Sequence, residues 1–187
     1  MPGGGNPGHP GAGELLGELG PALNAFLDAA RANQPLPLAP LEALAARLVD
    51  GLANGDELVL RALDVRGGQG SLAAHCIHVA VFAVRIAGGL DLPRAEQAKV
   101  ALAGLVHDVG MVRFPPDFAQ VERTLTAREL EELQRHPEEG YKILSGLGPA
   151  YKWLADVAHQ EHERGGQGSL AAHCIHVAVF AVRIAGG

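Results

Sequence analysis

Histidine and carboxylate side chains stand together where apolar helical stretches end. His107 and Asp108 are adjacent and follow the apolar run 100–106. Neighbouring residues on a helix project about 100° apart, so both side chains reach one ion only from a helix end or from opposite flanks of the ion. Imidazole and carboxylate together suit a divalent metal such as Mn, Fe, Ni or Zn. A pair of this kind, taken alone, is more often just a polar helix end.

Further histidines fall on other predicted helices. The set comprises His75 within 71–89, His136 before Pro137, and Glu161 with His162 near the end of 151–163. A bundle builds a metal site by placing such side chains on facing helices. The alternative of separate, buried and hydrogen-bonded histidines stays open on spacing alone.

The elements that must position these residues are all helical. Ala and Leu dominate the sequence, aromatic residues make up only 4%, and no segment alternates as a half-buried strand would. We therefore expect an all-α fold, with the histidines and Asp108 converging at one end of a helix bundle. The predicted helices are 14–31 (interrupted at Gly20–Pro21), 41–52, 56–63, 71–89, 93–106, 126–136 (opened by a capping box, Thr126 with Glu129) and 151–163.

Composition limits the classes of function. The chain has 187 residues, enough for one domain with a real core, and its net charge of −6 argues against a nucleic-acid polymer as partner. Two cysteines make no disulfide framework, and Cys76 is better explained as a small core residue than as a reactive thiol. We recognise no apolar run long enough to span a bilayer and no leader peptide at the N-terminus. We therefore expect a cytoplasmic protein without a membrane partner.

The order of the motifs resembles the HD superfamily of metal-dependent phosphohydrolases, above all the HD-GYP branch of cyclic di-GMP phosphodiesterases. The motifs are His-Asp-Val-Gly at 107–110, Leu125-Thr126 before an acidic helix, His-Pro-x-x-Gly at 136–140 and His-Glu-Arg at 162–164. The resemblance covers 56–164, about two-thirds of such a domain. It implies an HD-type helical bundle that is incomplete at the C-terminus. Upstream, we expect a disordered Gly/Pro-rich tail (1–13) and a helical segment with a Pro-rich linker (14–55).

The resemblance also implies a site and a reaction. Two divalent ions, Fe, Mn or similar, would be held by His75, His107, Asp108, His136, Glu161 and His162. Asp108 would bridge the ions, and with His107 forms the catalytic pair. A water activated between the ions would attack phosphorus in a cyclic dinucleotide, cyclic di-GMP first, or in another phosphoester. Met111 replaces a lysine common in the family, and Ser71 stands where some relatives add a carboxylate for a third metal.

The end of the chain repeats an earlier part. Residues 165–187 copy 67–89 letter for letter, which points to a recent duplication or a joining error rather than a structural repeat. The Gly-Tyr-Pro motif and a later metal-binding Asp are therefore missing. Two alternatives to an enzyme remain: a decayed HD-type signalling or interaction module, and an inactive product of duplication. We expect the apolar copy 169–185 to dock on another surface or to cause self-association.

Overall fold

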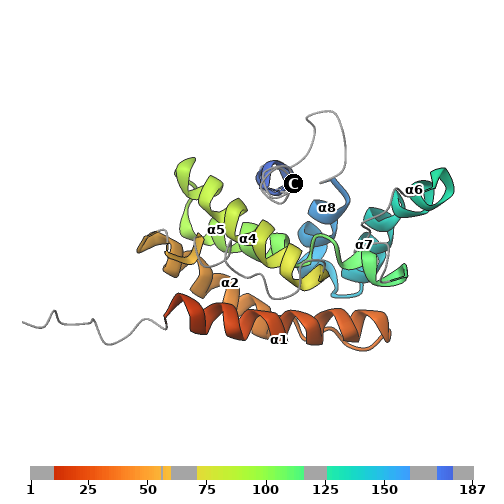
Figure 1. Cartoon of the computed structure of the whole chain (residues 1–187), viewed down its shortest axis with the longest axis horizontal. Helices are drawn as coiled ribbons and strands as arrows, with labels where there is room; N and C mark the ends of the chain where they lie inside the picture. The colour runs from red at the N-terminus through yellow and green to blue at the C-terminus, as the bar shows by residue number, and fades with distance from the viewer. Residues whose placement is uncertain (1–10, 56, 60–70, 116–125, 161–171, 179–187) are drawn as a thin grey trace, which may run out of the picture.

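The computed structural model describes residues 11–55, 57–59, 71–115, 126–160 and 172–178. Within these ranges every regular element is helical, so the all-α prediction is confirmed. In chain order they are α1 (Ala12–Arg31), α2 (Leu38–Ala53), α4 (Leu72–Gly89), α5 (Arg94–Val106), the 3₁₀ helix η1 (Val109–Arg113), α6 (Ala127–Leu133), α7 (His136–Ser145), the 3₁₀ helix η3 (Pro149–Tyr151) and α8 (Lys152–Gln160) (Figure 1). Residues 57–59 and 172–178 are helical as well.

Helix α1 continues through Pro21, so the predicted interruption at Gly20–Pro21 was wrong. A proline inside a helix costs about 3 kcal/mol. The apolar stripe of α1 outweighs that cost, because each fully buried large side chain contributes about 1.5–3 kcal/mol. The stripe comprises Leu15, Leu19, Leu23, Phe26 and Leu27. Pro21 and Gly17, whose carbonyl loses its partner, both lie on the exposed face, where water can satisfy that oxygen.

Two helix starts lie earlier than predicted. Helix α1 begins at Ala12, inside the segment expected to be a disordered tail. Helix α2 begins at Leu38, inside the expected linker, and includes Pro40 in its first turn. The first turn of a helix tolerates proline because its N–H groups have no partner within the helix.

The core helix of the fold is α4. The Ser71 hydroxyl caps it by accepting a hydrogen bond from the Ala74 amide at 3.1 Å. With a mean hydropathy of 1.6 over 18 residues, Leu72–Gly89 is long and apolar enough to cross a membrane, contrary to the expectation that no run of this kind is present. Nine of its residues are buried against the rest of the chain, and the core helix of a globular domain has the same composition. The helix carries His75 at the end of its first turn.

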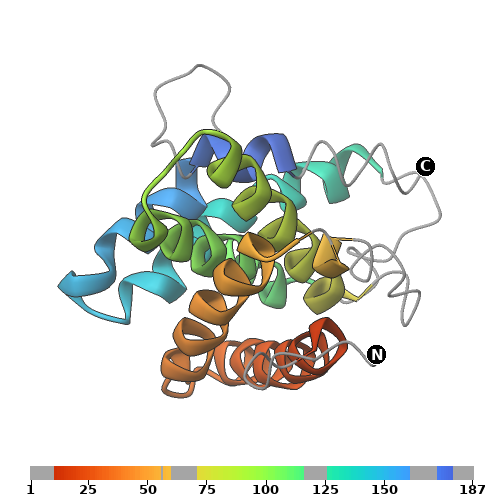
Figure 2. The same ribbon diagram turned by 90° about the vertical axis from the view of Figure 1, so that its left-hand side faces the viewer.

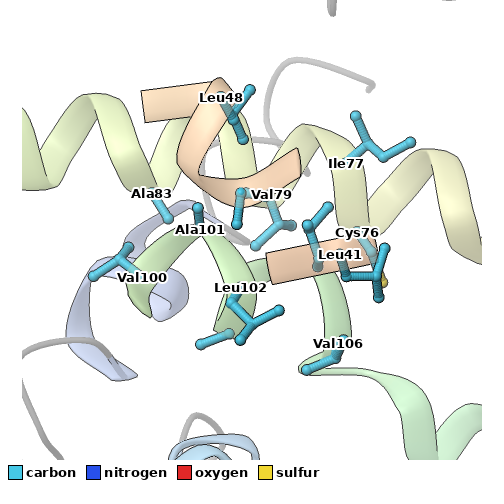
Figure 3. Packing of buried hydrophobic residues seen from close by; sticks show 14 of the residues in the cluster. Leu41, Leu48, Cys76, Ile77, Val79, Ala83, Val100, Ala101, Leu102 and Val106 are labelled. Carbon is cyan, nitrogen blue, oxygen red and sulfur yellow. The ribbon is translucent and has the colours of Figure 1, made fainter. Parts of the chain in front are cut away.

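Helices α4 and α5 pack closely, and α2 crosses them (Figure 3). A Cβ at Gly104 of α5 would lie 2.7 Å from the Ala80 Cα of α4, so only glycine permits this approach. Leu41 and Leu48 of α2 pack over the pair. The buried residues of α1, α2, α4, α5 and α8 belong to one hydrophobic core.

Two polar links join the N-terminal helices to the segments that follow α5. Arg113 in η1 donates hydrogen bonds to the Asn33 side chain (2.6 Å) and to the Arg31 carbonyl (3.4 Å) at the end of α1. The Tyr151 hydroxyl in η3 donates to Glu42 of α2 at 2.9 Å. Segment 14–55 therefore packs on the same body as the later helices.

Helix α6 opens with the predicted capping box of Thr126 and Glu129. None of its residues is buried, and it projects from the body of the molecule (Figure 1). His136 was expected at its end, but α6 stops at Leu133 and His136 is the first residue of α7. The physical reason is Pro137, which disrupts a helix from within but fits the first turn of a new one.

The second copy of the repeat is helical at 172–178 and packs against its own chain. Figures 1 and 2 show this segment on the side of α4 and α5 opposite to α1. Ile175 is fully buried, whereas Val177 is 52% exposed. In the first copy the equivalent of Val177 is Val79, which is completely buried. Identical letters thus occupy two different environments, as expected for a copy that docks on another surface; self-association stays a prediction.

Candidate metal centre

The centre begins where α5 ends. His107 is the C-cap of α5, and Asp108 precedes η1, so the two side chains leave the helix at its last turn. The Nδ1 atom of His107 lies 2.9 Å from the Gly104 carbonyl oxygen. A carbonyl only accepts, so Nδ1 carries the hydrogen and Nε2 is left to act as a ligand. The His107 side chain is 1% exposed, and its Nε2 makes no hydrogen bond of good geometry with the residues that the structure describes.

His136 reaches the same place from the start of α7. Its Nδ1 atom lies 2.6 Å from the Leu133 carbonyl oxygen, which fixes the same tautomer as in His107. Its Nε2 lies 3.3 Å from Asp108 Oδ1. Two histidines, 29 positions apart in the sequence, therefore present the same nitrogen atom to one carboxylate.

Gly110 makes this approach possible. A Cβ at Gly110 would overlap the His136 carbonyl oxygen, and it would lie 2.6 Å from the Gly140 nitrogen. The backbone of η1 thus rests directly on the first turn of α7. No side chain fits between them, which sets the distance between Asp108 and His136.

The third imidazole comes from α4. His75 Nε2 lies 3.5 Å from Asp108 Oδ2, and His107 Nε2 lies 3.4 Å from the same oxygen. The rings of His75 and His107 are 5.6 Å apart between centroids. The structure therefore brings together four of the six predicted ligands: His75, His107, Asp108 and His136. Glu161 and His162 lie outside the described residues.

The charge of Asp108 dominates the electrostatics of the centre. Burial disfavours a charged His107, but the neighbouring Asp108 carboxylate more than offsets this effect and holds the pKa of His107 well above its ordinary value. Burial raises the pKa of the Cys76 thiol. Cys76 is therefore a neutral thiol, as expected of a core residue.

The residues present fit a divalent metal. Ligand atoms held about 2.1 Å from one ion lie about 3.0–3.4 Å apart at octahedral or tetrahedral angles. The three distances from the imidazole nitrogens to the carboxylate oxygens are 3.3, 3.4 and 3.5 Å. Backbone carbonyls orient two of the imidazoles, as is usual for metal-binding histidines. His75, His107 and Asp108 alone could hold an ion, since their ligand atoms all lie within 4.8 Å of one another.

The HD domain family model matches residues 72–185, well over half of the 187 residues. The chain belongs to the HD domain family. The match extends past 164, where the resemblance was expected to end, and includes the described tail segment 172–178. No solved structure matches the chain significantly.

Two curated relatives of this HD domain have named activities. A cyclic di-GMP phosphodiesterase of Pseudomonas aeruginosa is 30% identical over 90 residues, which are 48% of this chain and 22% of the relative. The cyclic di-GMP phosphodiesterase response regulator RpfG of Xanthomonas campestris pv. campestris is 31% identical over 106 residues, 56% of this chain and 27% of the relative. The chain thus spans about a quarter of the length of either relative.

Some residues that shape the metal centre were not among the metal ligands predicted from the sequence. Gly104 and Gly110 set the helix contacts. Of these, only the glycine of His-Asp-Val-Gly had a sequence signal, as part of the motif. His159, the histidine of α8 within the described residues, makes an edge contact with Tyr141, 5.8 Å between ring centroids.

Proposed function

We propose that this chain is a metal-dependent phosphodiesterase of HD type that hydrolyses a cyclic dinucleotide, with cyclic di-GMP as the first candidate. The observation that carries the proposal is the convergence of three imidazole nitrogens on the Asp108 carboxylate, at 3.3–3.5 Å. The names of the two relatives support the choice of substrate. We also propose a cytoplasmic location, where a cyclic dinucleotide signal would be degraded.

The two oxygens of Asp108 suit it to bridging two ions. Oδ2 faces His75 and His107, whereas Oδ1 faces His136. Divalent ions, when bound, would be held by this carboxylate together with His75, His107 and His136. Bound divalent ions would lower the pKa of a water nucleophile and neutralise the charge that develops on the phosphoryl oxygens.

In this scheme the side chains of the protein bind the metal, and backbone carbonyls orient two of the histidines. His107 and His136 keep their Nε2 atoms directed at the centre through the carbonyls of Gly104 and Leu133. The Cys76 thiol, with its raised pKa and complete burial, is unsuited to attack phosphorus. This supports water as the nucleophile.

A second candidate function is a decayed signalling or interaction module. Met111, where a lysine is common, removes a cation that would meet the substrate phosphate. A module of this kind would bind metal yet hydrolyse nothing. An inactive product of the duplication would do neither.

The deciding experiment compares hydrolysis of cyclic di-GMP and of bis(p-nitrophenyl) phosphate by the full chain, supplied with Mn²⁺ or Fe²⁺. The variants are Asp108→Ala and, as matched control, Asp28→Ala, whose side chain is 71% exposed on α1. We expect activity on cyclic di-GMP that Asp108→Ala abolishes and Asp28→Ala retains. Cleavage of the model diester alone would reject the cyclic dinucleotide. Metal binding without any cleavage would favour the decayed module.

A further inference from the structure

The 3₁₀ helix η1 packs against both α1 and α7. On the α7 side, Gly110 approaches the His136 carbonyl so closely that no Cβ would fit. On the α1 side, the Arg113 guanidinium donates two hydrogen bonds, from Nη2 to the Asn33 side-chain oxygen at 2.6 Å and from Nη1 to the Arg31 carbonyl at 3.4 Å. The segment that follows Asp108 is therefore attached on two sides.

The end of α1 is suited to receive a cation. The last carbonyls of a helix have no partner within the helix, and a positive charge is stabilised beside them. The Arg31 carbonyl belongs to this last turn. Asn33, just beyond it, has a φ of 53°, a left-handed conformation that asparagine and glycine adopt more readily than other residues. The Arg31 side chain itself pairs with Asp28 at 2.6 Å, so it does not compete for these acceptors.

The backbone of η1 carries this attachment to the candidate metal centre. Asp108 is the N-cap of η1, and its carbonyl accepts a hydrogen bond from the Met111 amide at 2.9 Å. The Asp108 backbone therefore moves with η1. The steric contact of Gly110 limits how closely η1 approaches α7, but it does not stop η1 from sliding or moving away. The hydrogen bonds of Arg113 fix the other end of η1 and so restrict that freedom.

We propose that Arg113 is a positioning residue: bound to the end of α1, it fixes η1 and thereby places Asp108 for metal binding. This inference rests on the proposed metal-dependent function. Without the link, η1 occupies positions in which Asp108 is displaced from the histidines, and the apparent metal affinity falls with the fraction of molecules that keep the arrangement. One hydrogen bond contributes about fivefold to such an equilibrium. Helix α1, which carries none of the four ligands brought together, thus takes part in metal binding.

The chain offers matched variants on both sides of the link. Arg113→Ala removes both hydrogen bonds. Asn33→Gly removes the side-chain acceptor but suits the left-handed backbone, whereas Asn33→Asp keeps an acceptor oxygen. The control is Arg31→Ala, which removes an exposed cation from the same helix end and leaves the backbone carbonyl in place.

The test is titration of the metal-free full chain and its variants with Co²⁺, followed by visible absorption. We expect Arg113→Ala and Asn33→Gly each to weaken Co²⁺ binding about fivefold. The double variant should bind no more weakly than Arg113→Ala alone, because both changes remove the same link. Asn33→Asp and Arg31→Ala should stay within about twofold of the wild type.

Three results would overturn the positioning role. They are wild-type Co²⁺ affinity in a folded Arg113→Ala variant, additive losses in the double variant, and an equal loss in Arg31→Ala. If Arg113→Ala does not fold, the two Asn33 variants decide: weaker binding in Asn33→Gly than in Asn33→Asp supports the proposal, and equal binding in both contradicts it. A wild-type chain that binds no Co²⁺ would instead reject the proposed function, and the positioning role with it.

Discussion

Substituting Gly110 by alanine should move Asp108, which precedes η1, away from His136, which begins α7. The added methyl group would overlap the His136 carbonyl oxygen and lie 2.6 Å from the Gly140 nitrogen and 2.9 Å from the His136 carbonyl carbon. All three are backbone atoms, so no flexible side chain can move aside. Relief to ordinary contact distances near 3.5 Å requires a displacement of at least about 1 Å between η1 and α7.

That displacement acts directly on the distance from Asp108 to His136. The present Oδ1 to Nε2 distance of 3.3 Å suits a shared centre, and ligand distances tolerate only about 0.2 Å of error. We expect Gly110→Ala to weaken Mn²⁺ binding at least about tenfold and to lower the free energy of unfolding by about 1–3 kcal/mol, the usual cost of overpacking.

Isothermal titration with Mn²⁺ and urea unfolding measure the two effects. The control is Gly17→Ala on α1, where an added Cβ meets nothing within 4 Å. It should raise the free energy of unfolding by about 0.5–1 kcal/mol and leave metal affinity unchanged. Wild-type Mn²⁺ affinity in a folded Gly110→Ala variant would refute the idea that this backbone contact sets the site.

Three further predictions concern pH, α6 and the tail. In the metal-free protein, the raised pKa of His107 stabilises the fold fully below pH 6.5, its ordinary value, and this contribution is lost as pH rises through the raised pKa; urea unfolding in EDTA should show that loss, and a His107→Gln variant should not. Thr126→Ala removes the capping box of the exposed helix α6, so it should reduce helicity by circular dichroism, with a cost of about 1 kcal/mol or less, and leave Mn²⁺ affinity unchanged. Deleting 165–187 should lower self-association in sedimentation velocity; a higher association state would show that the docked segment 172–178 shields the body.

The sequence alone predicts the position of a helix where its apolar stripe and its capping residues indicate the same limits. Ser71 begins α4 and the Thr126 box begins α6, as expected. Where a proline falls within an apolar helical stripe, the prediction of a helix end at the proline was wrong. At Pro21 the buried stripe of α1 prevailed, because only one exposed hydrogen bond is lost. At Pro137 the proline separates α6, which ends at Leu133, from α7, which begins at His136.

The candidate site could be predicted as a set of residues but not as a mechanism of assembly. His107 and Asp108 are adjacent, so their joint action can be inferred locally. The approach of His136 depends on Gly110 touching the backbone of α7, a contact between segments far apart in the chain. The spacing of residues along the chain does not contain that distance.

The central claim, that Asp108 and the histidines around it hold divalent metal, is tested most directly by elemental analysis. The full chain and its Asp108→Ala and Asp28→Ala variants would each be loaded with Mn²⁺, dialysed and measured for bound metal by mass spectrometry. We expect the wild type and Asp28→Ala to retain metal and Asp108→Ala to retain none. Equal metal content in all three proteins would place the site elsewhere and contradict the account.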